Sequence, residues 1–184
     1  MSAELLQQVG AVLHGHFLLT SGRHSAVYFE KFRLLEQPRL LSEFVAAMLA
    51  GLPARQAQLV VGPTLGGVLV AYEAARQLGI SAAYAEREGD RRAFRRDGAP
   101  KPHTPVLVVD DVLTTGTSIR EVLELLQHYQ AQVVGIGVLI DRSEQSPDFG
   151  VPFHSALRLT AVSYEPAECP LCKAGIPLTK RGSR

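Results

Sequence analysis

The chain has 184 residues, of which 46% are apolar and 20% charged, so it fits one globular domain that buries a core without disulfides or metals. Its net charge of +1 excludes a protein that binds polyanions through bulk charge, so any basic site must be local. Two cysteines exclude a disulfide scaffold, and no apolar run approaches the about 20 residues that span a bilayer. The N-terminal residues lack the basic start and apolar stretch of a signal peptide, so a cytoplasmic protein is expected.

The first 50 residues are predicted to form helices around a hairpin. Apolar residues at helical spacing predict a helix over 3–13. A polar turn at 20–25 between two apolar segments predicts a strand, a turn and a strand over 17–29. Pro38 is typical of a helix start, and the apolar stripe after it predicts a second helix to residue 49.

From residue 58 onward, short apolar runs alternate with amphipathic stretches. Strands are predicted over 59–61, 82–85, 106–109 and 133–140, and helices over 68–78 and 119–129. This alternation predicts the α/β class, with a central parallel sheet and helices on both faces. The segment 86–98 holds five arginines and four acids. It is predicted to be a mobile loop, because it cannot bury itself.

The stretch from Val106 to Ser118 carries the most chemical information. A buried strand ends in two carboxylates, Asp110 and Asp111, and parallel sheets bind their ligands at that end of the strands. Small hydroxylated residues and one glycine then open a helix, whose N–H groups can cradle a phosphate: Thr114, Thr115, Gly116, Thr117 and Ser118. Paired carboxylates can accept hydrogen bonds from vicinal hydroxyls or hold a divalent metal. Phosphate, diol and metal together describe a phosphorylated sugar.

A capped helix after a strand is the plainer interpretation of this stretch, with Thr117 or Ser118 as the N-cap. It explains one hydroxyl group, but not four beside two acids whose burial costs solvation free energy unless they are used. The chain contains neither a Gly-Lys-Ser/Thr triplet nor the GxGxxG spacing, which excludes a P-loop and a dinucleotide fingerprint.

The stretch Asp110–Ser118 resembles the signature with which the type I phosphoribosyltransferases bind phosphoribosyl pyrophosphate (PRPP). The turn 62–67 stands where that family has its pyrophosphate loop. The segment 15–25, followed by Tyr28 and Phe29, is similar to the N-terminal segment of orotate phosphoribosyltransferases, which separates them from purine enzymes. Together the matches cover residues 15–142.

The resemblance implies that N1 of orotate attacks C1 of PRPP, that pyrophosphate leaves, and that orotidine 5′-monophosphate forms in UMP biosynthesis. It implies Mg²⁺ held mainly through PRPP rather than by protein ligands. It implies PRPP contacts for Thr64, Gly66, Gly67, Arg87, Asp110, Asp111, Val112, Leu113, Thr114, Thr115, Gly116, Thr117 and Ser118. Arg87, Arg91, Asp110 and Asp111 would be catalytic, and Thr114 and Arg142 would hold orotate.

The implied organisation is a single domain over 1–184, with a small hood at 1–35, a PRPP-binding core at 58–142 and a tail at 163–184. The implied partners are PRPP and orotate, without nucleic acid or membrane. The implied assembly is a homodimer in which the arginine-rich loop closes over the neighbour's site, where it would stabilise the leaving pyrophosphate.

The chain departs from the family pattern at three positions. Arg91 stands near an expected lysine, and Gly66 and Thr20 occupy places that are often lysine. Arginine keeps the charge but cannot donate a proton at neutral pH. These departures leave open a phosphoribosyltransferase for another purine or pyrimidine base. A non-catalytic PRPP-sensing regulator is a further alternative, although the chain has no spare helix-turn-helix.

Cysteines and histidines outside these motifs have plainer interpretations. Cys169 and Cys172 form half of a zinc knuckle, which two chains of a dimer could complete, but a tail turn with free thiols is the simpler expectation. His24 is predicted to line a polar site, and His14 and His16 to lie on the surface. Arg23 fits a surface position and a functional one equally.

Overall fold

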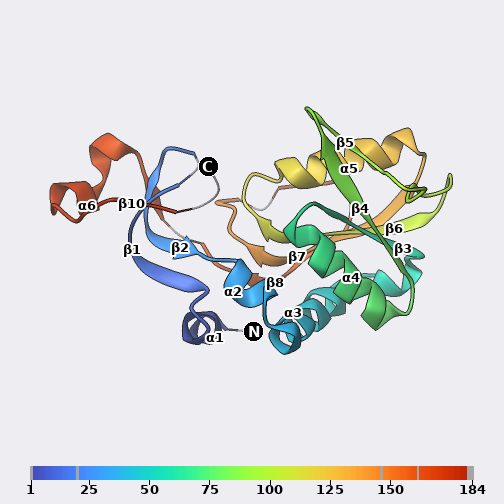
Figure 1. Ribbon diagram of the computed structural model, residues 1–184, viewed down its shortest axis with the longest axis horizontal. Helices are drawn as coiled ribbons and strands as arrows, with labels where there is room; N and C mark the ends of the chain where they lie inside the picture. Colours follow the sequence, from blue (N-terminus) through green and yellow to red (C-terminus); the bar gives the residue numbers. More distant parts are fainter. Residues whose placement is uncertain (1, 20, 146, 161, 182–184) are drawn as a thin grey trace.

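The computed structural model describes residues 2–19, 21–145, 147–160 and 162–181. Its largest sheet has the strand order β5-β4-β3-β6-β7-β8 (Figure 1). The strands are β3 (Leu59–Pro63), β4 (Ser81–Glu88), β5 (Arg91–Ala93), β6 (Pro105–Leu113), β7 (Gln132–Asp141) and β8 (Phe153–Arg158). Every neighbouring pair in this sheet is parallel except β4 and β5. The predicted α/β class with a central parallel sheet and helices on both faces is confirmed.

Helices cover both faces of this sheet. On one face lie α3 (Pro38–Ala50) and α4 (Gly66–Leu78), and on the opposite face lies α5 (Thr117–His128) (Figure 1). Short helices α1 (Ala3–Gln8) and α2 (Phe32–Leu35) join the α3 side, and a 3-10 turn, η1 (Ala54–Gln56), follows α3. Within the described ranges, no helix has both the length and the apolar character needed to cross a bilayer.

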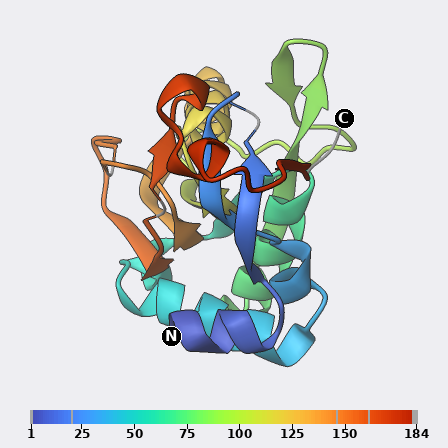
Figure 2. The ribbon, with the colours of Figure 1, turned by 90° about the vertical axis from the view of Figure 1, so that its left-hand side faces the viewer.

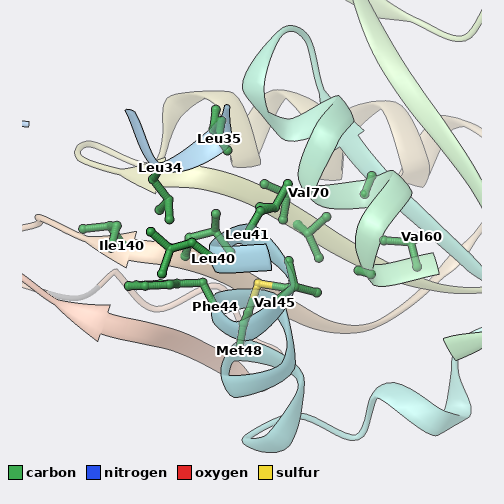
Figure 3. Packing of buried hydrophobic residues seen from close by; sticks show 14 of the residues in the cluster. Leu34, Leu35, Leu40, Leu41, Phe44, Val45, Met48, Val60, Val70 and Ile140 are labelled. Atoms are coloured by element: carbon green, nitrogen blue, oxygen red, sulfur yellow. The ribbon is translucent and has the colours of Figure 1, made fainter. Parts of the chain in front are cut away.

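Strand β6 contributes to two separate cores because its side chains alternate between the faces of the sheet. Leu107 and Val109 pack with α3 and α4, whereas Val106 and Val108 pack with α5. Figure 3 shows the first cluster, in which Phe44 and Met48 of α3 are completely buried. The apolar run that predicted this strand is therefore buried on both sides, as parallel sheets require.

A second, four-stranded sheet stands at one end of the molecule, and we call it the hood sheet (Figure 2). Its order is β10-β1-β2-β9, formed by β1 (Val12–Leu18), β2 (His24–Phe29), β9 (Ser163–Tyr164) and β10 (Thr179–Lys180). Between β9 and β10 the chain forms η2 (Pro166–Glu168) and α6 (Pro170–Lys173). The N-terminal hairpin is thus flanked on both edges by strands of the C-terminal segment.

Three expectations about elements are corrected. The helix predicted over 3–13 ends at Gln8, because Gly10 adopts a φ of 73° and the chain enters β1 at Val12. The parallel edge strand β8 and the tail strands β9 and β10 were not predicted. Strand β6 also continues past Val109 to Leu113, so the two aspartates lie inside the strand.

The segment 86–98 is only partly the loop that its charges predict, because residues 86–88 and 91–93 are paired strands whereas residues 94–98 lie outside helices and strands. Strands β4 and β5 pair antiparallel through it, with Arg87 opposite Arg92, and we call residues 86–98 the arginine hairpin. Arg92 is buried, and it donates hydrogen bonds to Glu121 of α5 and to the carbonyl of Ala85. One arginine therefore anchors the hairpin against the sheet, which charge counting could not show.

Candidate active site

The two aspartates of β6 are held by the backbone of their own strand. Asp110 and Asp111 are 7% and 4% exposed. The Oδ1 atom of Asp110 accepts a hydrogen bond of 2.8 Å from the Asp111 N–H, and that of Asp111 accepts one of 2.6 Å from the Val112 N–H. Pairing with β7 continues to Leu113, so the sheet fixes both carboxylates.

Burial makes this acid pair a poor place for two negative charges. Burial, which removes water from the carboxylate, and to a smaller extent repulsion from Asp111 raise the pKa of Asp110 to about 7. Asp111 Oδ2 lies 2.8 Å from Lys31 Nζ, an ion pair without hydrogen-bond geometry. Hydroxyl groups or a cation that approached this pair could replace both the proton on Asp110 and the lysine.

The turn before α4 passes directly over the acid pair. A Cβ atom on Gly66 would lie 1.6 Å from Asp111 Oδ2, so only glycine fits there. The turn runs from Pro63 to Gly67 and includes a cis peptide bond between Thr64 and Leu65. It therefore brings backbone amide groups close to the carboxylates.

The loop after β6 forms a separate recess. Gly116 has a φ of 79° and stands at the N-cap of α5 without a side-chain cap. The alternative that Thr117 or Ser118 caps this helix is therefore wrong. Asp110 and the residues from Val112 to Ile119 surround a recess of about 30 Å³. The free N–H groups of a helix N-terminus favour an anion such as a phosphate group here.

A cavity of about 780 Å³ connects these parts with the hood sheet. Its lining includes five basic side chains, namely Arg23, Lys31, Arg120, Arg142 and Arg181, and three acids, namely Asp110, Asp111 and Glu144. Burial lowers the pKa of Arg142, whose backbone N–H donates to the Leu113 carbonyl beside the acid pair. The cavity suits a ligand with several negative charges and a group of hydroxyls.

Most of the residues predicted for the site meet around these two spaces. Thr64, Gly66, Asp110, Asp111, Val112, Thr114, Thr115, Ser118 and Arg142 line the large cavity. Leu113, Gly116 and Thr117 line the recess. Gly67 is buried in the first turn of α4, where an added Cβ would lie 3.1 Å from Asp110 Oδ1. Thr20 lies outside the described residues.

Arg87 and Arg91 lie away from the acid pair of their own chain. Arg87 donates hydrogen bonds of 2.9 Å to both carboxylate oxygens of Glu121. Arg91 is exposed and lines a second cavity of about 600 Å³ between the arginine hairpin and α5. The structure thus separates these two cations from the other predicted site residues.

The sequence did not indicate several polar residues of the large cavity, among them Lys31, Arg120, Ser163 and Arg181, and it left the role of Arg23 open. Arg23 donates to the hydroxyl and carbonyl oxygens of Ser163, each over 2.8 Å, and also bonds to Glu165. No spacing rule connects residues 140 positions apart. Lys31 could have been suspected only from its place directly after the Tyr28-Phe29 match.

Comparison with known proteins identifies the family. A family model described as "Phosphoribosyl transferase domain" matches residues 53–148. An orotate phosphoribosyltransferase of Thermotoga maritima is 47% identical over 185 aligned positions, which cover 100% of this chain and 98% of that protein. The chain belongs to the orotate phosphoribosyltransferases. Another orotate phosphoribosyltransferase, from Caldanaerobacter subterraneus subsp. tengcongensis, is 42% identical and covers 98% of this chain and 95% of its own.

A solved structure supports the same assignment to the orotate phosphoribosyltransferases. The crystal structure of the orotate phosphoribosyltransferase from Aeropyrum pernix superposes with a TM-score of 0.76 at 35% identity, covering 86% of this chain and 94% of that chain. The resemblance based on 110–118, 62–67 and 15–25 is therefore confirmed as a statement of family.

Proposed function

We propose that this orotate phosphoribosyltransferase transfers the ribose 5-phosphate group of PRPP to orotate in the large cavity, giving orotidine 5′-monophosphate and pyrophosphate. One observation carries the proposal. Asp110 and Asp111 of β6, residues 114, 115 and 118 of the loop that follows it, and Arg142 directly after β7 line one cavity. The cavity of about 780 Å³ can hold both substrates at once.

PRPP lies with its 5′-phosphate in the recess of the 114–118 loop. The N-terminus of α5 and the hydroxyls of Thr115 and Thr117, whose oxygens are 2.9 Å apart, supply donors for the phosphate oxygens. Asp110 and Asp111 then accept hydrogen bonds from the ribose 2′ and 3′ hydroxyls. This contact explains why two acids remain buried in β6.

The pyrophosphate lies toward the turn 63–67, whose backbone amides approach the acid pair at Gly66. As the bond between C1 and the pyrophosphate oxygen breaks, its electron pair goes to pyrophosphate. N1 of orotate forms the new bond to C1, and the proton of N1 passes to the departing pyrophosphate. Lys31, 2.8 Å from Asp111, is placed to turn toward this developing charge.

Orotate lies between the acid pair and the hood sheet, with its carboxylate on Arg142. A guanidinium can hold a carboxylate through two parallel hydrogen bonds. Arg142 is half-buried at the end of β7, and its position close to Thr114 matches the pair that the family resemblance assigns to the base. Exclusion of water from such a site strengthens the ion pair between the orotate carboxylate and Arg142.

Mg²⁺ fits the donor set of this site. Magnesium prefers oxygen ligands and is commonly bound by one or two carboxylates together with substrate phosphates. Asp111 Oδ2 is buried and lacks a hydrogen-bond donor among the described residues. Mg²⁺ that enters with PRPP would neutralise charge on the pyrophosphate, and Asp110 and Asp111 would face it through the ribose hydroxyls or directly.

We further propose a homodimer with shared active sites. Arg87 and Arg91 do not line the large cavity of their own chain, and the arginine hairpin projects from the edge of the sheet (Figure 2). A hairpin placed over the neighbouring subunit's cavity would bring its cations to the pyrophosphate. Location in the cytoplasm stays a prediction from the sequence.

The test measures pyrophosphate release with PRPP, Mg²⁺ and one base at a time: orotate, uracil, adenine, guanine or hypoxanthine. Orotate should be the best substrate. In Arg142→Gln, kcat/KM for orotate should fall by about 10- to 150-fold, the equivalent of losing one charged hydrogen bond of about 1.5–3 kcal/mol. Turnover of uracil, which lacks the carboxylate, should be unchanged. Arg39→Gln, at an exposed arginine of α3, is the control.

Two outcomes would contradict the proposal. A purine that is used better than orotate would assign the cavity to another base. Tight PRPP binding without pyrophosphate release from any base would favour a PRPP-sensing regulator.

A further inference from the structure

Four side chains of the types that bind metal ions converge at the hood sheet, in segments that are far from the acid pair in the sequence. His16 and His24 come from β1 and β2, and Cys169 and Cys172 come from the turn around α6. One potential ligand atom from each lies within 4.8 Å of the others. His16, His24 and Cys169 are buried. The prediction that His16 lies on the surface is therefore wrong.

Four of the six separations between these atoms are close to those of a tetrahedral zinc site, and the other two are at most 4.8 Å. His16 Nε2 is 3.1 Å from His24 Nδ1, 3.5 Å from Cys169 Sγ and 3.7 Å from Cys172 Sγ, and His24 Nδ1 is 3.3 Å from Cys172 Sγ. Bonds of about 2.05 Å from zinc to nitrogen and about 2.3 Å to sulfur, at tetrahedral angles, place two nitrogens about 3.3 Å apart and a nitrogen and a sulfur about 3.6 Å apart.

A second contact prepares His16 for this role. Its Nδ1 atom lies 2.7 Å from the carbonyl oxygen of Ile176, so Nδ1 carries the proton and donates it. The lone pair of Nε2 is then directed at the other three groups. Metal-bound histidines in proteins are usually oriented by such a hydrogen bond from their other ring nitrogen.

The segment that supplies the cysteines has almost no core of its own. Among residues 162–181, Cys169 is the only buried one, and the apolar side chains of Ile176 and Leu178 are 42% and 45% exposed. Its two strands contribute only two paired residues each to the hood sheet. Small segments of this kind are commonly held by a metal or a disulfide.

We propose that His16, His24, Cys169 and Cys172 of one chain bind a single Zn²⁺, which fastens the C-terminal segment to the N-terminal hairpin. Two thiolates and two imidazoles are a common zinc ligand set, and four protein ligands leave no open position for substrate, so the site is structural. The earlier alternative, in which two chains each supply a pair of cysteines, is not needed for four ligands.

The zinc site also bears on the candidate active site. Three residues of the large cavity belong to segments that the metal would join. Arg23 directly precedes His24, Ser163 pairs with Ser25 in the hood sheet, and Arg181 directly follows β10. Loss of zinc should therefore loosen the hood side of the large cavity while leaving the acid pair of β6 in place.

The first experiment measures metal content. The full chain, purified under reducing conditions with zinc in the growth medium, should contain one zinc per chain by elemental analysis. A ratio of one zinc per two chains would support the two-chain cysteine site instead. Cobalt substituted for zinc should show the strong visible absorption of tetrahedral cobalt and the charge-transfer band of cobalt–thiolate bonds.

Variants decide which residues are ligands. Cys172→Ser and His24→Asn should each lower zinc content at least tenfold in a competition with a chromophoric chelator. His14→Asn is the matched control, because His14 is on the same strand as His16 but is exposed and bonds to Gln7 instead. If a variant does not fold, the zinc ratio and cobalt spectrum of the parent chain still decide the question.

A third measurement tests the structural role. A chelator should make trypsin cleave at Lys173 and Lys180 at least tenfold faster, and added zinc should restore protection. Several results would overturn the proposal: less than one-tenth zinc per chain with no cobalt spectrum, a Cys169–Cys172 disulfide in freshly purified protein, or equal zinc content in the parent and in Cys172→Ser.

Discussion

The sheet core and the hood sheet position their functional residues by different means. In the core, Asp110 and Asp111 belong to a nine-residue strand in which the four residues from Val106 to Val109, on both sides of the sheet, are 0% exposed. In the hood, Arg23 is positioned by hydrogen bonds to Ser163 and Glu165 and lies beside a cluster of histidines and cysteines. The geometry of the core site therefore depends on apolar burial, whereas the position of Arg23 in the hood depends on polar contacts between segments far apart in the sequence.

The largest effect should come from removing a core side chain. Phe44→Ala on α3, where the side chain is 0% exposed, should lower the free energy of unfolding by about 3–5 kcal/mol. Ile176→Ala in the tail is the matched change in the hood, and it should cost less than about 0.5 kcal/mol because that side chain is 42% exposed. Urea unfolding of both variants measures the difference. Equal losses would show that the hood also depends on apolar burial.

Variants of the arginine hairpin test whether the active site in the core is complete within one chain. Arg91→Ala should lower turnover by about 100- to 1,000-fold, as for loss of one group that stabilises transition-state charge, and PRPP binding much less. When Arg91→Ala and Asp111→Asn dimers exchange subunits, half of the dimers are mixed and have one intact site, so activity should recover to about a quarter of the parent's. No recovery, with exchange shown by differently tagged chains, would place hairpin and acid pair in the same subunit.

The acid pair should matter for binding far more than for folding. Asp110→Asn and Asp111→Asn should each weaken PRPP binding by about 1.5–3 kcal/mol, because an amide accepts hydrogen bonds from the ribose hydroxyls less strongly than a carboxylate. Calorimetry with PRPP and Mg²⁺ measures this loss, and circular dichroism checks the fold. PRPP affinity equal to the parent's in both variants would remove these residues from the proposed site.

A separate effect concerns the dependence of stability on pH. The pKa of Asp110 is raised from 3.8 to about 7 in the folded chain, so the folded state holds a proton that the unfolded state has released over that range. This group therefore lowers the stability of the ligand-free enzyme as pH rises from about 4 to about 7. The urea midpoint of Asp110→Asn, relative to the parent, should rise between pH 5 and pH 8.

A control separates this effect from general charge removal. Asp90→Asn, which removes one charge from an exposed acid at the tip of the arginine hairpin, is the control. An identical response of the two variants would mean that burial of Asp110 does not govern the effect.

The same contrast explains what the sequence could predict. Core elements β3, α4, β4, β6, α5 and β7 could be predicted from local patterns, since β-branched runs and amphipathic stripes report directly on burial in a parallel sheet. The acid pair and the 114–118 loop could also be predicted from the sequence, because all their residues lie within one short stretch of the chain. The helix predicted over 3–13 was too long, since Val12 and Leu13 fit a helical stripe and a strand equally well until the positive φ of Gly10 is known.

The residues that were missed depend on contacts between distant segments. His16 was predicted to be exposed, but it lies 3.5 Å from the sulfur of Cys169, 153 positions away. The arginine hairpin was predicted to be a mobile loop because its charges were counted without Glu121, the partner on α5 that pairs with Arg87 and Arg92. The composition of each segment alone cannot show that Cys169 or Glu121 lies beside it in the fold. The shared-site homodimer stays a prediction for the same reason.

The hood sheet has a consequence for how the chain is made. The hairpin β1–β2 leaves the ribosome early, but the strands that pair with its two edges are translated more than a hundred codons later. Until then both edges present unpaired N–H and C=O groups, which are open to pairing with other chains. The sheet core, from β3 to β8, can close during this interval without them. Assembly of the hood side of the cavity is therefore among the last events of biosynthesis, and slow translation or early release between residues 158 and 179 would leave a folded core with an open, association-prone hairpin.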